Sequence, residues 1–316
     1  MRVPDILLPV PGVDLTRWAV VACDQYTAEP EYWQAVDDFV GDSPSTLRMI
    51  WPEAWLGRPG ADAVASVMKR YVAEGVLSEP QRCIVLVRRE TSSGVRRGLL
   101  MALDLERYDF RPGSSSLIRA TEGTVMNRLP PRIAIRRDAL LELPHAMLLI
   151  DDPDDTVIGP VDKPGLPLLY DLELMMGGGR LAGYRGKEEL ETGIARALGR
   201  LAVRGDSFLF AVGDGNHSMA TAKEHWNSIK NGLTEKERCE HPARYCLVEL
   251  LNIYDDGLIF EPIHRVVFPK CEKDFVDGLK NSLKGCGKQQ ILTKDKKINI
   301  DCPISSAETI KAVQEY

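Results

Sequence analysis

The sequence predicts an α/β protein with a tendency toward α+β, built on a mixed sheet with hairpins and flanking helices. Apolar residues at helical spacing alternate along the chain with short β-like runs. Two pairs of those runs are joined by turns typical of hairpins, which excludes a purely parallel sheet. The 316 residues are enough for two subdomains, and we expect these at 1–140 and 141–316.

In the first half of the chain, the pattern predicts one strand, then two helices, then a hairpin. The short apolar run 18–22 predicts the strand, and apolar residues on one face predict helices over 31–40 and 61–74. The β-like runs 83–89 and 95–105 flank a Thr-Ser-Ser-Gly turn, which predicts a hairpin.

The second half continues the alternation around one loop-rich passage. Pro and Gly concentrate over 159–186, and we expect a long functional loop there. The remaining pattern predicts helices over 130–143, 188–203, 218–230 and 275–283, strands over 145–150 and 208–212, and a second hairpin from 245–254 and 258–260.

Composition excludes several classes of function. The net charge of −6 argues against nucleic acid or an anionic membrane as the main partner. No apolar run reaches the roughly 18–20 residues that span a bilayer, and the first residues lack signal-peptide features, so we expect a cytoplasmic protein. Five His and seven Cys without paired spacing predict no zinc site, and we expect neither haem nor a nicotinamide cofactor.

The chain stops within an amphipathic pattern over 309–316. Two interpretations remain open. Either that segment is a helix that ends there, or the sequence is a piece of a longer protein truncated at its C-terminus.

The sharpest motif is an apolar strand followed by Gly-Asp-Gly-Asn-His-Ser at 213–218 and the start of a helix. Free N–H groups at a helix N-terminus bind anions, and glycines let a phosphate approach the backbone. Asp214 and His217 are the candidate catalytic residues, as base and proton carrier. The candidate ligand-binding residues of the turn are Gly213, Gly215, Asn216 and Ser218. The alternative is a tight turn in which Asn216 or Ser218 caps the helix.

Two further groups of residues are candidates for ligand binding. Arg119, Glu122 and Thr124 lie in Arg-Ala-Thr-Glu-Gly-Thr, where an Arg fork and a carboxylate suit a phosphorylated or zwitterionic ligand. An Arg–Glu pair that closes a loop is the alternative. His264 and Arg265 follow a predicted strand and would supply a proton donor and an anion clamp, unless the histidine is structural.

Asp151 and Asp152 begin an acidic run at the end of a predicted strand. Clustered carboxylates suit Mg²⁺, which takes oxygen ligands and shares them with substrate phosphates. The alternative is a solvated acidic turn.

Several strings of the sequence resemble the bacterial and archaeal family DUF1015. They are Asp-Gly-Asn-His-Ser at 214–218, the segments 119–124 and 261–267, Leu-Pro-His at 143–145, and 148–153. The resemblance runs from about residue 18 to about residue 267, and the family name carries no established activity. Its members are longer, which agrees with truncation at the C-terminus.

The turn is also similar to the Gly-x-His-Arg phosphate-binding turn of the ParB/sulfiredoxin superfamily, which includes nucleotide hydrolases and free-serine kinases. That similarity implies that Gly215 and His217 contact nucleotide phosphates and that Asp214 lies beside the transferred group. Ser218 stands where many relatives have Arg, which removes a bidentate phosphate ligand.

Together these features predict a nucleotide- or phosphate-dependent enzyme of the kinase or phosphohydrolase type, using Mg²⁺ with ATP or ADP and acting on a small anionic ligand. The alternative is a non-catalytic protein that binds or senses a metabolite or nucleotide, and Ser218 favours it.

Overall fold

The computed structural model describes residues 1–58, 60–91, 94–144, 146–204, 208–259, 267–303, 309 and 313. The chain divides into two compact units, 1–259 and 260–316. The boundary expected near residue 140 therefore falls inside the first unit. The physical reason is that strands from both sides of residue 140 pair in one sheet.

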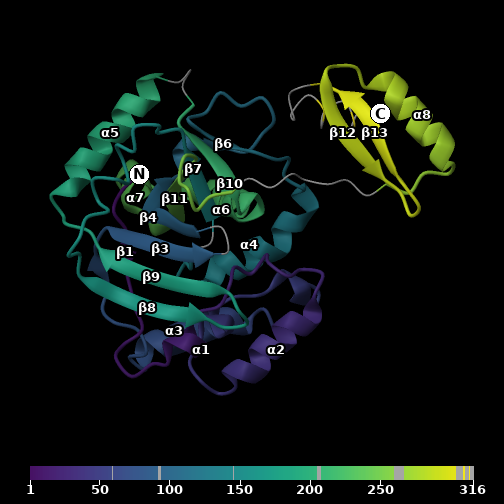
Figure 1. Cartoon of the computed structure of the whole chain (residues 1–316). Coiled ribbons are helices and arrows are strands. Elements are labelled where there is room, and N and C mark those ends of the chain that lie inside the picture. Colours follow the sequence, from purple (N-terminus) through teal and green to yellow (C-terminus); the bar gives the residue numbers. More distant parts are fainter. Residues whose placement is uncertain are drawn as a thin grey trace. The chain divides into compact units, whose positions relative to one another are not determined.

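That sheet has nine strands in the order β5-β6-β10-β7-β11-β4-β3-β9-β8 (Figure 1). The pairs β5–β6, β6–β10 and β7–β11 are parallel and the other neighbours are antiparallel, which confirms the mixed sheet. The strands are β3 (Val85–Thr91), β4 (Gly94–Asp104), β5 (Tyr108–Asp109), β6 (Ile118–Ala120), β7 (Ala146–Ile150), β8 (Leu168–Leu174), β9 (Gly179–Arg185), β10 (Phe210–Asp214) and β11 (Tyr245–Asn252).

Helices precede and follow these strands, so the α/β class is confirmed. The α-helices of the first unit are α1 (Leu15–Trp18), α2 (Pro30–Val40), α3 (Ala63–Ala73), α4 (Leu129–Asp138), α5 (Leu190–Arg204), α6 (Asn216–Ile229) and α7 (Glu235–Glu240). Short 3-10 helices span Thr46–Met49, Glu53–Trp55, Leu105–Arg107, Met126–Arg128, Lys230–Gly232 and Pro242–Arg244. In the part of the chain that the structure describes, no helix has the length and apolar character that crossing a membrane requires.

The main core lies on one face of the sheet, under α5 and α6. Alternate strand residues such as Leu99, Leu148 and Leu250 point to this face and are fully buried. Ala197 of α5 and Met219 of α6 pack against them. Burial of this face therefore fixes the position of α6, the helix that follows the Gly-Asp-Gly-Asn-His-Ser motif.

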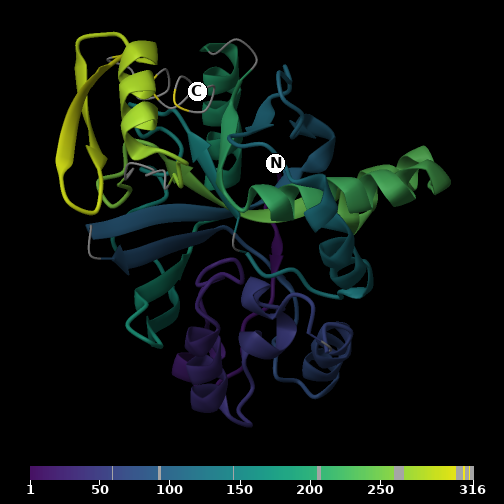
Figure 2. The same ribbon diagram turned by 90° about the vertical axis from the view of Figure 1, so that its right-hand side faces the viewer.

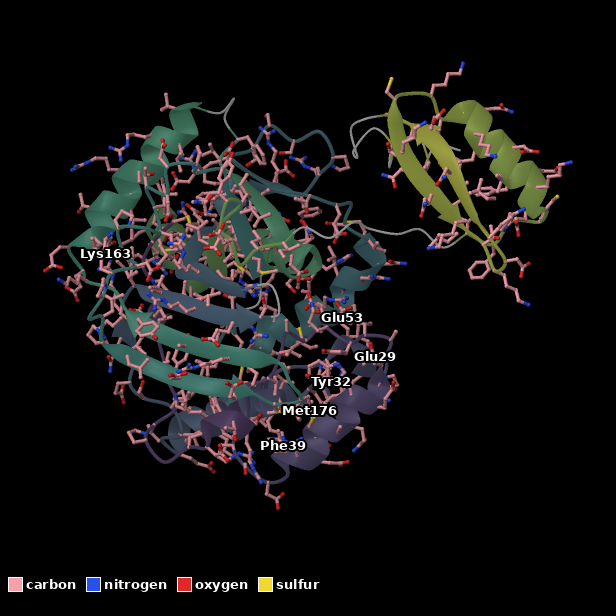
Figure 3. The ribbon with its side chains drawn as sticks, in the orientation of Figure 1. Glu29, Tyr32, Phe39, Glu53, Lys163 and Met176 are labelled. Atoms are coloured by element: carbon pink, nitrogen blue, oxygen red, sulfur yellow. The ribbon has the colours of Figure 1, made fainter. Side chains whose placement is uncertain are left out.

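The N-terminal helices form a separate layer, shown in purple and blue below the sheet in Figure 2. Trp18 and Tyr71 of this layer pack in one cluster with Ile135 of α4. Trp33 of α2 packs in another with Met175 from the turn between β8 and β9. Figure 3 labels the neighbouring Met176 together with residues of α2. These contacts attach the helical layer to the rest of the first unit at two places, α4 and the β8–β9 turn.

Two predicted elements differ from the structure. The run 18–22 forms no strand, because the Asp14 side chain accepts a hydrogen bond from Thr16 N (3.0 Å) and caps α1, whose last residue is Trp18. The passage 159–186 is not one long loop, since it contains the β8–β9 hairpin. A Cβ on Gly183 would lie 2.2 Å from the Tyr170 ring, so glycine here makes room for an aromatic residue on the neighbouring strand.

A turn after β11 replaces the second predicted hairpin. After β11, Asp255 caps a turn by accepting a hydrogen bond from Gly257 N (3.0 Å), and Leu258 and Ile259 belong to no strand. Residue 260, the last of the predicted pair, lies outside the described residues.

Three smaller strand and helix groups complete the description. In the first unit, β1 (Asp5–Ile6) pairs with β2 (Gln81–Arg82). In the second unit, β12 (Gly287–Leu292) and β13 (Lys297–Cys302) form an antiparallel hairpin, and α8 (Glu272–Ser282) precedes it. Leu279, Leu283 and Ile300 form the core of this unit.

Candidate functional site

The register of two parallel strands brings the two main sequence motifs together. Ala211 and Val212 of β10 pair with Arg119 and Ala120 of β6. Because the strands are parallel, both end at the same edge of the sheet. The loop that follows β6 and the turn that follows β10 therefore begin side by side, at the kind of position where ligands commonly bind in α/β sheets.

The turn between β10 and α6 depends on its two glycines. Gly215 has φ +80°, and a Cβ there would lie 2.9 Å from the Cα of Ala146 on β7. Gly213 is exposed, at a register shift in the β10–β7 pairing, and a Cβ there would lie 2.8 Å from the Leu149 side chain. The turn thus needs glycine for backbone conformation at one position and for space at both.

Asn216 joins the turn to the loop after β6. Its side chain is buried, and Oδ1 accepts a hydrogen bond from Thr121 N at 3.2 Å. Its Nδ2 donates to Thr121 Oγ1 at 3.2 Å, and this hydroxyl donates to Val212 O at 2.6 Å. The amide of Asn216 is therefore used within the protein, and its role as a ligand contact stays a prediction. Asn216 is not the helix cap, because Gly215 occupies that position.

Thr121 is the residue of this site that sequence reasoning missed. It lies within the Arg-Ala-Thr-Glu-Gly-Thr string, between two residues that the motif singled out. A hydroxyl at a strand end was the available signal, but its partner is 95 residues away in sequence. Only the pairing of β6 with β10 shows the contact.

Asp214 and His217 lie half-buried on either side of this connection. Asp214 Oδ1 accepts a hydrogen bond from Gly215 N at 2.8 Å, and among the described residues its Oδ2 has no partner. His217 Nε2 accepts a hydrogen bond from Val125 N at 3.4 Å. Ser218 is half-buried in the first turn of the same helix. The two candidate catalytic side chains thus belong to one turn, with one carboxylate oxygen left for a ligand or proton.

The loop after β6 contributes a small cavity of about 230 Å³, lined in part by Arg119, Thr121 and Glu122. Arg119 Nε donates to Ser116 O at 2.8 Å, and its guanidinium lies 4.8 Å from the centre of the Phe208 ring. Among the described residues no ion pair joins Arg119 to Glu122, so the loop is not closed in the way the alternative interpretation proposed.

Thr124, the third residue predicted in this loop, lies just before the contact between Val125 and His217. Its Oγ1 is buried without a hydrogen-bond partner among the described residues. Three predicted residues of β6 and its loop and six of the turn are therefore brought to one edge of the sheet. His264 and Arg265 lie outside the described residues.

The acidic run at 151–155 lies at the opposite edge. β7 is antiparallel to β10, with Met147 opposite Asp214, so Asp151 follows four residues further along, roughly 13 Å away. Asp152 is 1% exposed, and its carboxylate accepts hydrogen bonds from Thr156 Oγ1 (3.0 Å) and Val157 N (2.9 Å). The prediction that these acids share a site with the turn is corrected by this antiparallel direction.

Across the described residues, no group of three or more His, Cys, Asp and Glu is arranged to hold a metal ion. Any cation at the turn would therefore have to take ligands from Asp214 and from the bound molecule.

Two further charged groups lie on strands β4 and β11, and the sequence motifs did not indicate them. Arg97 donates to Asp255, which is almost fully buried (Nε–Oδ2 2.9 Å), and to Asp155 (Nη1–Oδ2 3.1 Å). Arg96 Nη2 lies 3.1 Å from Glu249 Oε2. Burial raises the pKa of Glu249, and Arg96 lowers it by less. Arg96 and Glu249 join the neighbouring strands β4 and β11, and Arg97 joins β4 to the turns that follow β7 and β11.

Comparison with known proteins identifies a family but no characterised relative. The family model described as "Protein of unknown function (DUF1015)" matches residues 7–309. No curated protein and no solved structure matches the chain significantly, so the similarity of the turn to the ParB/sulfiredoxin superfamily receives no support from these comparisons. The match covers nearly the whole chain, and the protein belongs to the DUF1015 family.

Proposed function

We propose that the turn 213–218 binds a phosphate-bearing small molecule, a nucleotide in the first instance, and that the protein is an enzyme of the kinase or phosphohydrolase type. The observation that carries this proposal is the junction of the two loops through Asn216 and Thr121. It places a glycine turn, the start of the 14-residue helix α6 and Arg119 at one edge of the sheet. Helix N-termini favour anions, and the exposed Gly213 leaves the backbone open to a phosphate.

The chemistry would rest on Asp214 and His217. Oδ2 of Asp214, for which the described part of the chain supplies no partner, suits a base that accepts a proton from an attacking hydroxyl or water. It also suits a single protein ligand for Mg²⁺, which is commonly held by one or two carboxylates together with substrate phosphates. His217 would donate to a phosphate oxygen once ligand binding displaces its long contact with Val125 N.

Thermal unfolding of the whole chain tests binding. ATP or ADP with Mg²⁺ is expected to raise the melting temperature, because a ligand at about 100 times its Kd stabilises the folded state by about 2.7 kcal/mol. A variant with Asp214→Asn and His217→Gln is expected to lose product formation. Asp42→Asn, an exposed acid on another part of the surface, is the matched control. The proposal fails if neither ATP, ADP nor inorganic phosphate changes the melting temperature, or if the double variant turns over like the parent.

A non-catalytic binder or sensor is the second candidate. Ser218 stands at the position where a bidentate Arg would hold phosphate, and Arg119 Nε is already used by Ser116 O. Mass spectrometry of ATP or ADP after long incubation separates the two functions. A thermal shift with unchanged nucleotide favours the sensor, and consumption of the nucleotide that depends on Asp214 favours the enzyme.

A further inference from the structure

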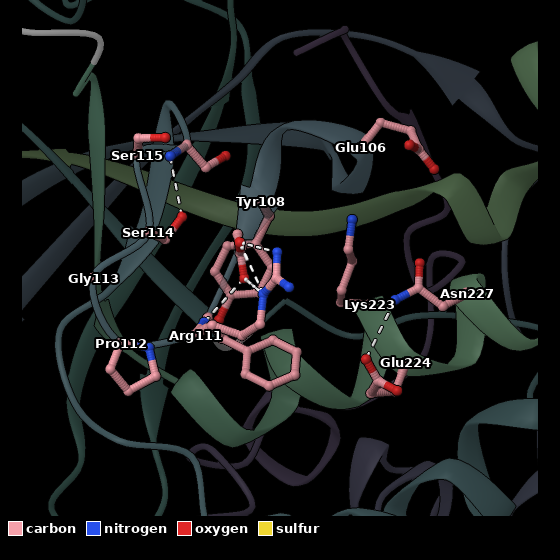
Figure 4. A pocket seen from close by; sticks show the side chains of 13 residues that line it. Glu106, Tyr108, Arg111, Pro112, Gly113, Ser114, Ser115, Lys223, Glu224 and Asn227 are labelled. Carbon is pink, nitrogen blue, oxygen red and sulfur yellow. Dashed lines mark hydrogen bonds and ion pairs between the residues drawn. The ribbon is translucent and has the colours of Figure 1, made fainter.

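A larger cavity lies along α6, and no residue of the turn 213–218 lines it (Figure 4). Its volume is about 820 Å³, within the range of about 300–1,000 Å³ typical of small-molecule sites. One wall is the connection from Glu106 to Ser116, and the other consists of Lys223, Glu224 and Asn227 of α6. The cavity is therefore large enough for a metabolite, and it adjoins the smaller cavity of the β6 loop, with which it shares the lining residues 110–114.

Most charged side chains of this cavity are already paired within the protein. Arg111 holds Asp109 through two nitrogens, with Nη2 2.7 Å from Oδ2 and Nε 3.0 Å from Oδ1. Glu106 accepts hydrogen bonds from Trp226 Nε1 and from Lys230 Nζ, the latter at 3.0 Å. These groups form the wall and leave little charge for a ligand to neutralise.

Lys223 differs from them. Its Nζ donates to Leu105 O at 2.7 Å, and no carboxylate of the described residues lies within ion-pair distance of it. Burial lowers the pKa of Lys223, and the more distant carboxylate of Glu106 raises it by less. Figure 4 shows the ammonium reaching from α6 toward the space between Glu106 and Tyr108. A half-buried ammonium without a counter-ion is costly to desolvate, and an anionic ligand would supply the missing charge.

Glu224 is the complementary group on the same wall. Its Oε1 accepts a hydrogen bond from Asn227 Nδ2 at 3.3 Å, and within the described part of the chain no cationic side chain pairs with it. The cavity thus presents one ammonium and one carboxylate, each without an opposite charge of its own. A ligand with only a negative charge would leave the Glu224 carboxylate unpaired and near another negative charge. A ligand with only a positive charge would leave the Lys223 ammonium unpaired and near another positive charge.

We propose that this cavity binds a small zwitterion, a molecule with an ammonium group and either a carboxylate or a phosphate. Lys223 holds the anionic group and Glu224 holds the ammonium. The two charges of the ligand then neutralise the two charges of the wall, and the rest of the cavity, where the charged groups are paired within the protein, leaves room for a side chain. The inference uses none of the residues of the turn and stands independently of the proposed phosphate site.

Isothermal titration calorimetry of the full chain at low ionic strength tests this with four probes. Glycine and O-phosphoethanolamine carry both charges, inorganic phosphate carries only the negative charge, and ethylamine carries only the positive charge. At least one zwitterion is expected to bind ten-fold or more tightly than phosphate and ethylamine. The stronger of the two zwitterions shows whether the anionic group is a carboxylate or a phosphate.

Variants locate the binding. Lys223→Met is expected to weaken it at least ten-fold, Lys223→Arg to retain most of it, and Glu224→Gln to remove the preference for the zwitterion. Lys236→Met, an exposed lysine away from the cavity, is the matched control, and circular dichroism confirms that each variant is folded. The proposal is overturned if no probe binds, if the Lys223-dependent binding of phosphate or ethylamine is as tight as that of the stronger zwitterion, or if folded Lys223→Met binds like the parent. It is also overturned if Arg119→Ala, on β6 beside the turn, is the variant that loses binding.

Discussion

Replacing Gly215 by alanine tests the geometry on which the candidate site depends. The left-handed backbone of Gly215 costs a residue with a Cβ about 1–2 kcal/mol. The new Cβ would also lie 2.9 Å from the Cα of Ala146, a main-chain atom of a central strand. Overpacking against a neighbour that is held in place typically costs about 1–3 kcal/mol.

The expected loss of unfolding free energy is the sum of these two costs, less the stabilisation that comes from the lower conformational entropy of the unfolded alanine chain. Alanine restricts the unfolded chain and returns about 0.4–1 kcal/mol, so the net loss is about 1–5 kcal/mol. At about 2–4 °C for each kcal/mol in a domain of this size, the melting temperature of the first unit falls by about 2–20 °C. Urea unfolding followed by circular dichroism measures the free energy directly.

Gly199→Ala is the matched control. Gly199 lies within α5, and a Cβ there meets nothing within 4 Å. Alanine is a better helix former than glycine by about 1 kcal/mol, so this variant is expected to be slightly more stable than the parent. The reasoning is refuted if the two alanine variants shift the urea midpoint equally, or if Gly215→Ala unfolds at the midpoint of the parent.

Three further variants test other parts of the first unit. Asn216→Ala leaves the backbone N–H of Thr121 without its acceptor and is expected to cost about 1–3 kcal/mol in urea unfolding, together with a smaller thermal shift by ATP. Arg97→Ala leaves the buried Asp255 carboxylate unpaired and is expected to cost about 3 kcal/mol by the same measurement. Because burial raises the pKa of Glu249, the parent loses stability as the pH rises from the ordinary carboxyl value of 4.5 to the raised pKa, so the stability of Glu249→Gln relative to the parent is expected to increase as the pH rises above 4.5.

Each of these has a control or an opposing outcome. An unchanged nucleotide response in Asn216→Ala would show that the two loops do not need to be joined for binding. Arg70→Ala removes an exposed pair with Glu74 and is expected to cost less than about 1 kcal/mol, so an equal cost for Arg97→Ala would contradict the buried ion pair. For Glu249→Gln, a difference from the parent that stays constant as the pH rises from 4.5 to about 8 would contradict the raised pKa.

Local patterns in the sequence predicted most helices and the first hairpin because helical spacing and turn residues act over a few positions. The hairpin of β3 and β4 was predicted from its Thr-Ser-Ser-Gly turn, and α6 from the motif that precedes it. The β8–β9 hairpin was not predicted. Its many prolines and glycines suggested a loop, whereas glycines such as Gly183 serve to accommodate a neighbouring aromatic ring.

The candidate site was predicted in part for the same reason. The turn 213–218 and the string 119–124 are each recognisable alone, since each combines glycines with polar residues at the end of a strand. Their contact is not, because Asn216 and Thr121 are 95 residues apart and meet only through parallel pairing. Asp151 has equally suggestive chemistry, but an antiparallel strand places it at the other edge.

The class of the protein, most of its helices and strands and the turn between β10 and α6 follow from local patterns in the sequence. Periodicity and turn chemistry are properties of neighbouring residues and can be read along the chain. The tertiary structure alone decided which motifs share an edge and which side chains remain unpaired. Lys223 shows why: its place on α6 is local, but its burial against Leu105 O, 118 residues away, depends on how the sheet and helix pack.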